Sequence, residues 1–139
     1  MFCKIILLFP DEKSKILLLK RSLNEGARPG CWDLPGGTVE LFEPLESVLK
    51  REVLEETSIR LHDKPVIVHA ELFERHGGMR LALVYFGKAR NTAVKLSDEH
   101  TEFKWVSPGA AAGLDFGPGG EYVNRALEKF LNLGMQKKA

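Results

Sequence analysis

Apolar positions gather in short runs that are typical of buried strands. The first two runs, Cys3 to Phe9 and Lys15 to Leu19, are separated by a short polar turn, which predicts an antiparallel hairpin. A second hairpin is predicted from Val66 to Glu74 and Arg80 to Ala89, because His76-Gly77-Gly78 lies between them and glycine suits a tight turn. These four runs supply most of the strands that the sequence predicts.

Two segments repeat apolar residues at helical spacing instead. Pro44 to Thr57 is expected to form a helix with proline in its first turn, and Glu121 to Leu133 an amphipathic C-terminal helix. Trp32 to Val39 is expected to be extended chain interrupted by glycines, and Glu102 to Val106 a short last strand. The sum is a mixed sheet with two or three helices, which is an α/β (α+β) sandwich rather than a βαβ array.

The predicted helix at 44–57 changes character along one face. Leu45, Val48 and Leu49 share a face, as residues that point into a core do. The same face continues through Glu52, Glu55 and Glu56, three carboxylates within an arc of about 100°. A purely structural helix would carry apolar residues at those positions. The outward face is expected to carry the remaining polar residues, which are Glu46, Ser47, Lys50 and Thr57.

Three neighbouring carboxylates repel one another, so a cation is expected between them. Arg51 can reach Glu55 one turn along, but a single guanidinium cannot neutralise three acids that face inward. Oxygen ligands without a nearby histidine or cysteine indicate Mg²⁺ or Mn²⁺ rather than Zn²⁺. The alternative is a solvated acidic face, since glutamate is common on surface helices. The register argues against that alternative, because the acids extend the apolar stripe.

A glycine pair lies before this helix, in the segment Leu34 to Thr38. Adjacent glycines let the backbone approach a metal ion or a phosphate without obstruction by a Cβ atom. We therefore expect the carbonyl oxygen of Gly36 to be a further metal ligand. Taken alone, the pair would be better explained as a simple tight turn.

These features together resemble a known family. The pattern Gly37-x5-Glu43-x7-Arg51-Glu52-Val53-Leu54-Glu55-Glu56-x-Ser58-Ile59 is similar to the Nudix box, which here runs from Gly37 to Ile59. The lead-in Trp32-Asp33-Leu34-Pro35-Gly36 and the later Glu102-Phe103-Lys104-Trp105-Val106 also resemble segments of that family. Ser58 stands where the box has its last glycine. That glycine suits a left-handed residue that closes the helix, and serine in this conformation costs on the order of 1 kcal/mol.

The resemblance implies a Nudix-like α/β/α sandwich and a hydrolase that acts on a nucleoside diphosphate linked to another group. It implies Glu52 and Glu56 as direct metal ligands, with Glu55 sharing ligation or helping to deprotonate water. Arg51 is implied as a residue that orients the acids. Glu99, in the polar loop before the last strand, is expected to be the general base or an additional ligand, with ordinary loop polarity as the alternative.

Candidate substrate contacts rest on single residues. Arg21 ends the second strand and can reach a phosphate through two nitrogens, although an exposed strand-end arginine explains it equally well. Trp32 can stack on a base, but single aromatic residues in a domain of this size more often belong to the core. A nucleoside triphosphate, including an oxidised one, is the favoured substrate. ADP-ribose, nucleotide sugars and dinucleoside polyphosphates stay open, as does a ligand sensor that has lost turnover.

Length and charge narrow the function further. The 139 residues, 44% hydrophobic and 28% charged, are expected to form a single domain over residues 1–139. The 20 basic and 19 acidic side chains leave a net charge of +1, which argues against binding to polymeric nucleic acid or to an anionic membrane. The N-terminal apolar run is too short to cross a bilayer and the two cysteines are expected to be free thiols, so a cytoplasmic protein is predicted. The oligomeric state stays open, with a homodimer as one possibility that the family resemblance raises, because many members are dimers.

Overall fold

The computed structural model describes residues 1–11, 14–40, 42–75 and 77–134. The strands are β1 (Phe2–Leu8), β2 (Ile16–Arg21), β3 (Trp32–Asp33), β4 (Gly36–Thr38), β5 (Val66–Arg75), β6 (Gly78–Lys88) and β7 (His100–Val106). The helices are α1 (Leu45–Thr57), α2 (Pro108–Ala112) and α3 (Glu121–Leu133). His76, expected in the turn of the second hairpin, lies outside the described residues.

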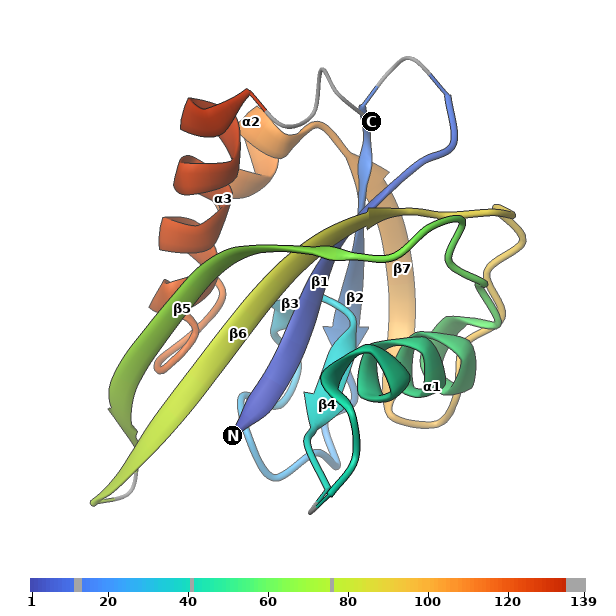
Figure 1. Cartoon of the computed structure of the whole chain (residues 1–139). Helices are drawn as coiled ribbons and strands as arrows, with labels where there is room; N and C mark the ends of the chain where they lie inside the picture. The colour runs from blue at the N-terminus through green and yellow to red at the C-terminus, as the bar shows by residue number, and fades with distance from the viewer. Residues whose placement is uncertain (12–13, 41, 76, 135–139) are drawn as a thin grey trace.

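β1 lies at the centre of the sheet (Figure 1). It pairs in parallel with β6 along its whole length, from Phe2 opposite Ala82 to Leu8 opposite Lys88. It pairs antiparallel with β2 and β4, while β3 and β7 pair with β2, and β5 pairs with β6. Both hairpins predicted from the sequence are confirmed, and the sheet is mixed.

Successive residues of β1 point into two different cores. Ile6 and Leu8 pack on one face of the sheet, in a cluster to which α3 contributes Phe130. Ile5 and Leu7 pack on the opposite face, in a cluster to which α1 contributes its apolar residues. Figure 1 shows α1 on one side of the sheet and α2 and α3 on the other. The structure therefore confirms the α/β/α sandwich that the sequence predicts.

Three local features differ from the predictions. α2 has no counterpart among the predicted elements, because five residues are too few to show a helical repeat. The last strand begins at His100 rather than at Glu102. Thr57, expected on the outward face of α1, is fully buried. Its hydroxyl donates to the carbonyl of Val53 and accepts from the N–H of Ile59, so these hydrogen bonds offset the cost of burying it.

α1 ends on a left-handed residue at the position where the Nudix box has its last glycine. Ser58 has φ 62° and ψ 16°, and its N–H donates to the carbonyl of Leu54 at 2.9 Å. Serine therefore adopts there the conformation that glycine adopts at lower cost.

Cys3 and Cys31 are both free thiols, as expected. Within the described ranges, the helices are too short or too polar for any of them to cross a membrane.

Candidate active site

The glycine pair of β4 lies between β1 and α1, where no side chain fits. Gly36 has φ 144°, and a Cβ atom there would lie 2.0 Å from the carbonyl oxygen of Cys3. A Cβ atom at Gly37 would lie 2.3 Å from the carboxylate carbon of Glu52. The two glycines therefore let the backbone reach α1, where the N–H of Gly36 donates a hydrogen bond of 2.9 Å to Oε1 of Glu56.

The three acidic residues of α1 occupy different surroundings. Glu56 is only 4% exposed, and burial raises its pKa to about 8. Glu52 is half-buried, and burial raises its pKa as well. The Glu55 side chain is 60% exposed and lies outside the lining of the cavity described below. The structure therefore turns two of the three acids inward.

Arg51 holds the acids of α1 and the loop before it in place. Its Nε and Nη2 donate to the two carboxylate oxygens of Glu43 at 2.9 and 3.0 Å, and its Nη1 donates to Oε1 of Glu52 at 2.8 Å. These hydrogen bonds lower the pKa of Glu43. Glu55 is more distant, at 3.6 Å from Nη1. The guanidinium therefore orients Glu52 and ties Glu43 to the helix.

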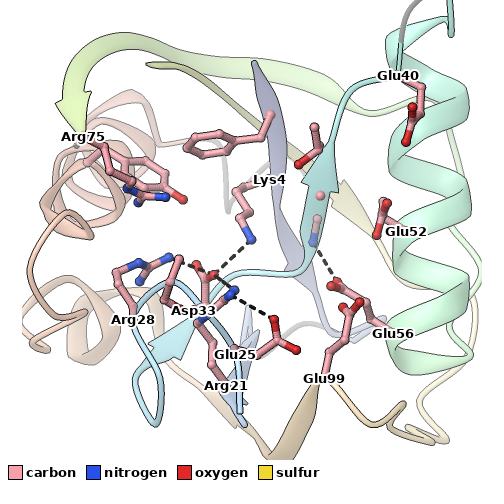
Figure 2. A pocket seen from close by; sticks show the side chains of 16 residues that line it. Lys4, Arg21, Glu25, Arg28, Asp33, Glu40, Glu52, Glu56, Arg75 and Glu99 are labelled. Carbon is pink, nitrogen blue, oxygen red and sulfur yellow. Dashed lines mark hydrogen bonds and ion pairs between the residues drawn. The ribbon is translucent and has the colours of Figure 1, made fainter. Parts of the chain in front are cut away.

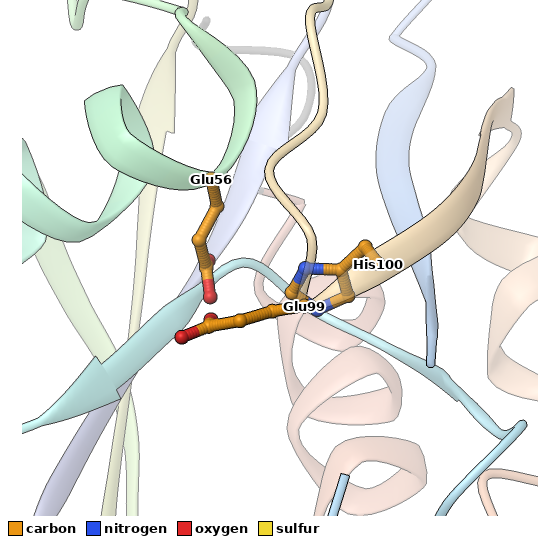
Figure 3. Close-up of side chains that lie close together, drawn as sticks. All are labelled: Glu56, Glu99 and His100. Atoms are coloured by element: carbon orange, nitrogen blue, oxygen red, sulfur yellow. The ribbon is translucent and has the colours of Figure 1, made fainter. Parts of the chain in front are cut away.

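The end of the loop before β7 and the start of β7 add Glu99 and His100 to this group (Figure 3). One oxygen from each of Glu56 and Glu99 and one ring nitrogen of His100 lie within 4.8 Å of one another. Glu99 is exposed, whereas His100 is 5% exposed and neither of its ring nitrogens has a partner in the part of the chain that the structure describes. Burial lowers the pKa of His100 to about 4, with a further contribution from the charge of Lys4, so the ring is neutral at neutral pH.

These side chains fit a divalent cation. Carboxylates that share one space repel each other unless a cation lies between them, and a buried polar atom without a partner costs about 1–3 kcal/mol. Glu52, Glu56 and Glu99 present oxygen donors of the kind that Mg²⁺ and Mn²⁺ bind. Gly36 presents its N–H to Glu56, and its carbonyl oxygen as a ligand stays a prediction.

A cavity of about 310 Å³ has opposite charges at its two ends (Figure 2). The acidic end is lined by Glu40, Glu52, Glu56 and Glu99. The basic end is lined by Lys4, Arg21, Arg28 and Arg75. One cavity can therefore hold a cation at one end and the oxygen atoms of a ligand at the other.

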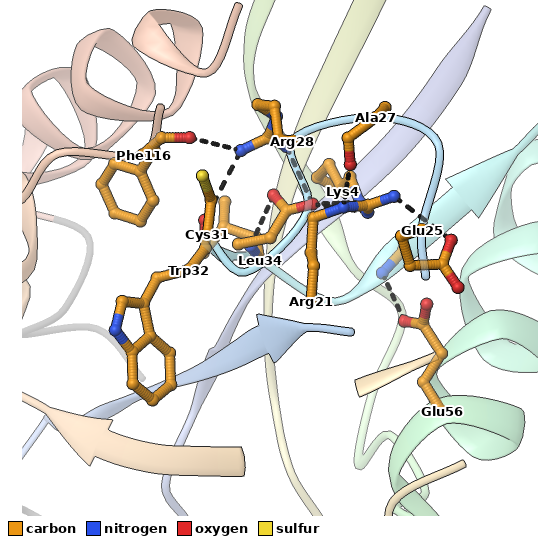
Figure 4. Close-up of polar contacts among 12 residues, drawn as sticks. Lys4, Arg21, Glu25, Ala27, Arg28, Cys31, Trp32, Leu34, Glu56 and Phe116 are labelled. Carbon is orange, nitrogen blue, oxygen red and sulfur yellow. Dashed lines mark hydrogen bonds and ion pairs between the residues drawn. The ribbon is translucent and has the colours of Figure 1, made fainter. Parts of the chain in front are cut away.

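Asp33 is the fully buried counter-ion of the basic end (Figure 2), and Figure 4 shows the polar contacts of Lys4, Arg21 and Arg28 there. Its Oδ2 lies 2.9 Å from Arg28, 3.0 Å from Lys4 and 3.3 Å from Arg21. Burial alone would raise the pKa of Asp33, but Lys4 and Arg28 hold it well below its ordinary value. Glu25 is a second carboxylate here, 3.4 Å from Arg21. Two carboxylates cannot neutralise the four cations of the basic end, so it keeps a positive charge.

Arg75 reaches the basic end from β5, and no carboxylate among the described residues lies within ion-pair distance of it. Its Nη2 donates to the carbonyl of Gly119 at 3.3 Å, and its guanidinium carbon lies 5.4 Å from the ring centre of Phe73. Burial and the nearby charge of Arg28 lower the pKa of Arg75. This arginine is therefore the cation of the basic end that is most available to a ligand.

Aromatic rings lie beside these cations. The rings of Phe73 and Tyr122 stack with centroids 5.4 Å apart, and Phe2 packs edge-on against both. Phe2 and Tyr122 line the cavity. In the described part of the chain, the buried hydroxyl of Tyr122 and the Nε of Arg28 have no hydrogen-bond partner. A bound ligand can supply the missing hydrogen-bond partner of each of these two groups.

The two predicted substrate contacts lie in different places. Arg21 lines the cavity, but its guanidinium already donates to the carbonyl of Ala27 at 2.6 Å and contacts Glu25 and Asp33. Trp32 is not part of the cavity lining. Its ring packs against the core, with the Nζ atom of Lys104 4.3 Å from the ring centre.

Most of the basic end was not predicted from the sequence. Arg28, Arg75 and Tyr122 come from segments far apart in the chain, and no local pattern connects them. Two signals were present in the sequence. Lys4 is a charge inside an otherwise apolar strand, and Asp33 lies inside the lead-in to the Nudix box. A buried charge needs a partner, so these two residues could have been paired in advance.

The fold and the cavity define the class to which the protein belongs. It is an α/β/α domain with a cavity between its elements. Acidic residues of α1, next to the glycine pair of β4, line one end of this cavity, and basic residues line the other. The family model of the NUDIX domain matches residues 4–126. The chain belongs to the Nudix family.

Individual relatives support this assignment. The nucleoside triphosphatase NudI of Salmonella schwarzengrund is 32% identical over 110 residues, which cover 71% of this chain and 77% of the relative. A MutT-like protein of Streptomyces ambofaciens is 32% identical over 97 residues. That match covers 70% of this chain but only 58% of the relative, so the chain spans less than two thirds of its length. The crystal structure of the MutT protein from Methanosarcina mazei Go1 is 36% identical, with a TM-score of 0.80 and coverage of 96% of this chain and 94% of the other.

Proposed function

We propose that this protein is a divalent-cation-dependent hydrolase that cleaves a P–O–P bond in a small nucleotide, with a nucleoside triphosphate, including an oxidised one, as the favoured substrate. One observation carries the proposal. A single cavity of about 310 Å³ has Glu52, Glu56 and Glu99 at one end and the cations of the basic end at the other. A nucleoside triphosphate needs both, because its phosphates bind cations and its other oxygens accept hydrogen bonds. The relative named nucleoside triphosphatase NudI supports a nucleotide of this kind.

The acidic end is the proposed cation site. Glu52, Glu56 and Glu99 hold Mg²⁺ or Mn²⁺, and the N–H of Gly36 fixes the carboxylate of Glu56 in position. When bound, the cation lowers the pKa of a coordinated water molecule and neutralises charge on the phosphates. Hydrolysis would form a bond from a water oxygen to phosphorus and break the P–O bond to the leaving phosphate, while the proton of the water passes to the leaving phosphate or to solvent. Arg51 keeps Glu52 aimed at this site through its hydrogen bond of 2.8 Å.

The basic end is the proposed site for the rest of the nucleotide. Arg75 donates to oxygen atoms of the substrate, since no described carboxylate occupies it. The hydroxyl of Tyr122 and the Nε of Arg28 provide further hydrogen bonds. Phe2 and Tyr122 provide aromatic surface for a base. Arg21 maintains the pocket through Asp33 and Ala27.

Three accompanying proposals concern the whole molecule. We place the protein in the cytoplasm and treat residues 1–139 as a single catalytic domain. We also propose a homodimer, on the strength of the family alone. Size-exclusion chromatography with light scattering tests the last of these directly.

The test is a substrate panel with product analysis. Nucleoside triphosphates, oxidised nucleoside triphosphates, ADP-ribose, nucleotide sugars and dinucleoside polyphosphates are incubated with and without Mg²⁺. We expect hydrolysis of a triphosphate that needs the cation and that stops on chelation. ¹⁸O from labelled water should appear in one product, as cleavage by water requires. Tight nucleotide binding without turnover under any cation would instead identify a ligand sensor and overturn the proposal.

A further inference from the structure

His100 is a histidine buried beside the acidic end, and no polar contact among the described residues accounts for its burial. It is the first residue of β7 and pairs across the sheet with Arg21. Its side chain is 5% exposed, yet within the described residues neither ring nitrogen has a hydrogen-bond partner. A neutral imidazole has one nitrogen that donates and one that accepts. Buried polar atoms are nearly always paired, so two unpaired nitrogens on one ring indicate a partner that the protein chain does not supply.

The position of the ring indicates which partner is missing. One ring nitrogen lies within 4.8 Å of a carboxylate oxygen of Glu56 and of one of Glu99 (Figure 3). Two ligands bound to one ion at about 2.1 Å are about 3.0 Å apart when adjacent and about 4.2 Å apart when opposite. The three donors therefore need to close by only a small distance to share one cation.

We propose that His100 is a nitrogen ligand of the cation site, beside the carboxylates of Glu56 and Glu99, with Glu52 as the further carboxylate of that site. This inference rests on the proposed function, whose cation site it specifies. Mg²⁺ binds oxygen ligands almost exclusively, whereas imidazole suits transition-metal ions. The site therefore binds Mn²⁺ more tightly than Mg²⁺. The sequence favoured oxygen ligands alone, because the acids of the helix have no histidine near them in the chain.

A competing role for His100 makes a different prediction. The imidazole could donate a hydrogen bond to Glu56 or Glu99 and orient that carboxylate without touching the cation. In that case, replacing the imidazole of His100 would weaken the binding of every cation by a similar factor. A direct nitrogen bond instead affects Mn²⁺ more than Mg²⁺ and leaves a magnetic signature on the manganese.

The decisive experiment is pulsed electron paramagnetic resonance of the full chain loaded with Mn²⁺. We expect echo modulation from one directly bonded ¹⁴N nucleus, which should be replaced by the ¹⁵N pattern when the protein is made with ¹⁵N-labelled histidine. This comparison uses the unmodified sequence and so does not depend on a variant that folds. Bound Mn²⁺ with no nitrogen coupling would overturn the inference.

Two variants assign the nitrogen to this residue. In His100→Asn we expect the coupling to disappear and the dissociation constant for Mn²⁺ to rise at least about tenfold, while that for Mg²⁺ changes less than about threefold. The matched control is His62→Asn, because His62 is exposed and lies away from the cavity lining. The assignment would be refuted if the nitrogen coupling persisted in His100→Asn, or if the dissociation constants for Mn²⁺ and Mg²⁺ rose by the same factor.

Failure of this inference can be told apart from failure of the proposed function. Cation-dependent hydrolysis with no nitrogen coupling leaves the enzyme intact and rejects His100 as a ligand. A protein that binds neither Mn²⁺ nor Mg²⁺ rejects both.

Discussion

The N–H of Gly36 donates a hydrogen bond of 2.9 Å to Oε1 of Glu56, so the glycine turn and the acidic helix meet at one carboxylate. That carboxylate is 4% exposed and lies beside Glu99 and His100. The hydrogen bond fixes the position of a buried acid but does not remove the cost of its charge, since its pKa is still raised to about 8. Without a bound cation, this acid is therefore mostly protonated at neutral pH.

The stability of the cation-free protein should fall as pH rises through this pKa. The folded state keeps a proton on Glu56 up to a pKa of about 8, whereas an ordinary carboxyl group loses it at 4.5. The contribution to the free energy of unfolding is complete below the lower value and disappears as pH passes the upper one. A tenfold change in proton affinity corresponds to about 1.4 kcal/mol, so the midpoint temperature should drop by several degrees.

The measurement is thermal unfolding in a chelator from about pH 6 to about pH 9. Glu56→Gln is the matched variant, because a neutral amide oxygen still accepts the hydrogen bond from Gly36. The wild-type curve should fall relative to that of Glu56→Gln, and added Mn²⁺ should restore it at high pH. Parallel curves for the two proteins would show that Glu56 does not carry the effect.

Turnover should separate Glu56 from Glu55. Glu56→Gln removes a charged ligand from the acidic end, and kcat should fall by at least ~10²-fold with the fold intact. Glu55→Gln is the control, because that side chain is 60% exposed and lies outside the cavity lining. In Glu55→Gln, kcat should fall by less than about tenfold. Equal losses in both variants would restore Glu55 to the set of ligands.

A methyl group at Gly37 should damage the site more than the fold. In Gly37→Ala the new Cβ would lie 2.3 Å from the carboxylate carbon of Glu52, which is the end of a flexible side chain and can move aside. We expect kcat to fall about tenfold or more, while the free energy of unfolding changes by less than about 2 kcal/mol. Gly109→Ala is the control, since nothing lies within 4 Å of a Cβ there. Unchanged turnover in Gly37→Ala would remove Glu52 from the mechanism.

Arg75 is expected to contribute to substrate binding and not to the rate of the chemical step. Arg75→Ala removes a charged donor from the basic end, where no described carboxylate needs it, so the fold should be unaffected. KM should rise about tenfold or more, with kcat within about threefold of wild type. Arg80→Ala, at an exposed position of β6, is the comparison. Identical KM values for the two variants would show that the basic end does not bind substrate.

Ser58 offers a stabilising substitution that leaves the site untouched. Its φ of 62° strains a residue that has a Cβ atom, whereas glycine adopts this conformation freely. Ser58→Gly should raise the free energy of unfolding by about 0.5–1 kcal/mol without changing kcat. Ser58→Ala should bring no such gain, because alanine keeps the Cβ atom. Denaturant titration of the three proteins makes the comparison.

The elements and the acidic helix could be predicted because their signals are local. The apolar stripe at Leu45, Val48 and Leu49 fixes the register of α1, and the register points Glu52, Glu55 and Glu56 inward. The structure turns only Glu52 and Glu56 inward, since the Glu55 side chain is 60% exposed. The same reasoning placed Thr57 outside, which is wrong. A hydroxyl that finds partners within its own helix terminus can be buried without cost, and helical periodicity does not contain that information.

The basic end could not be predicted, because its charges meet only through the tertiary fold. Lys4 and Asp33 lie 3.0 Å apart although they are far apart in the sequence, and Arg75 comes from a third strand. His100 illustrates the same limit. Sequence spacing separates it from Glu56, whereas the antiparallel pairing of β7 with β2 brings it to the acidic end. Long-range pairing therefore decides which side chains meet at this site.

The parallel pairing of β1 with β6 has a consequence for how the protein is made. β1 is synthesised long before β6, the strand that pairs along its whole length and ends only at Lys88. A nascent chain shorter than this already contains α1 and exposes one edge of β1, with neither core closed. Fragments that stop before β6 are thus expected to aggregate, and any split version of the protein must keep β1 and β6 on the same piece.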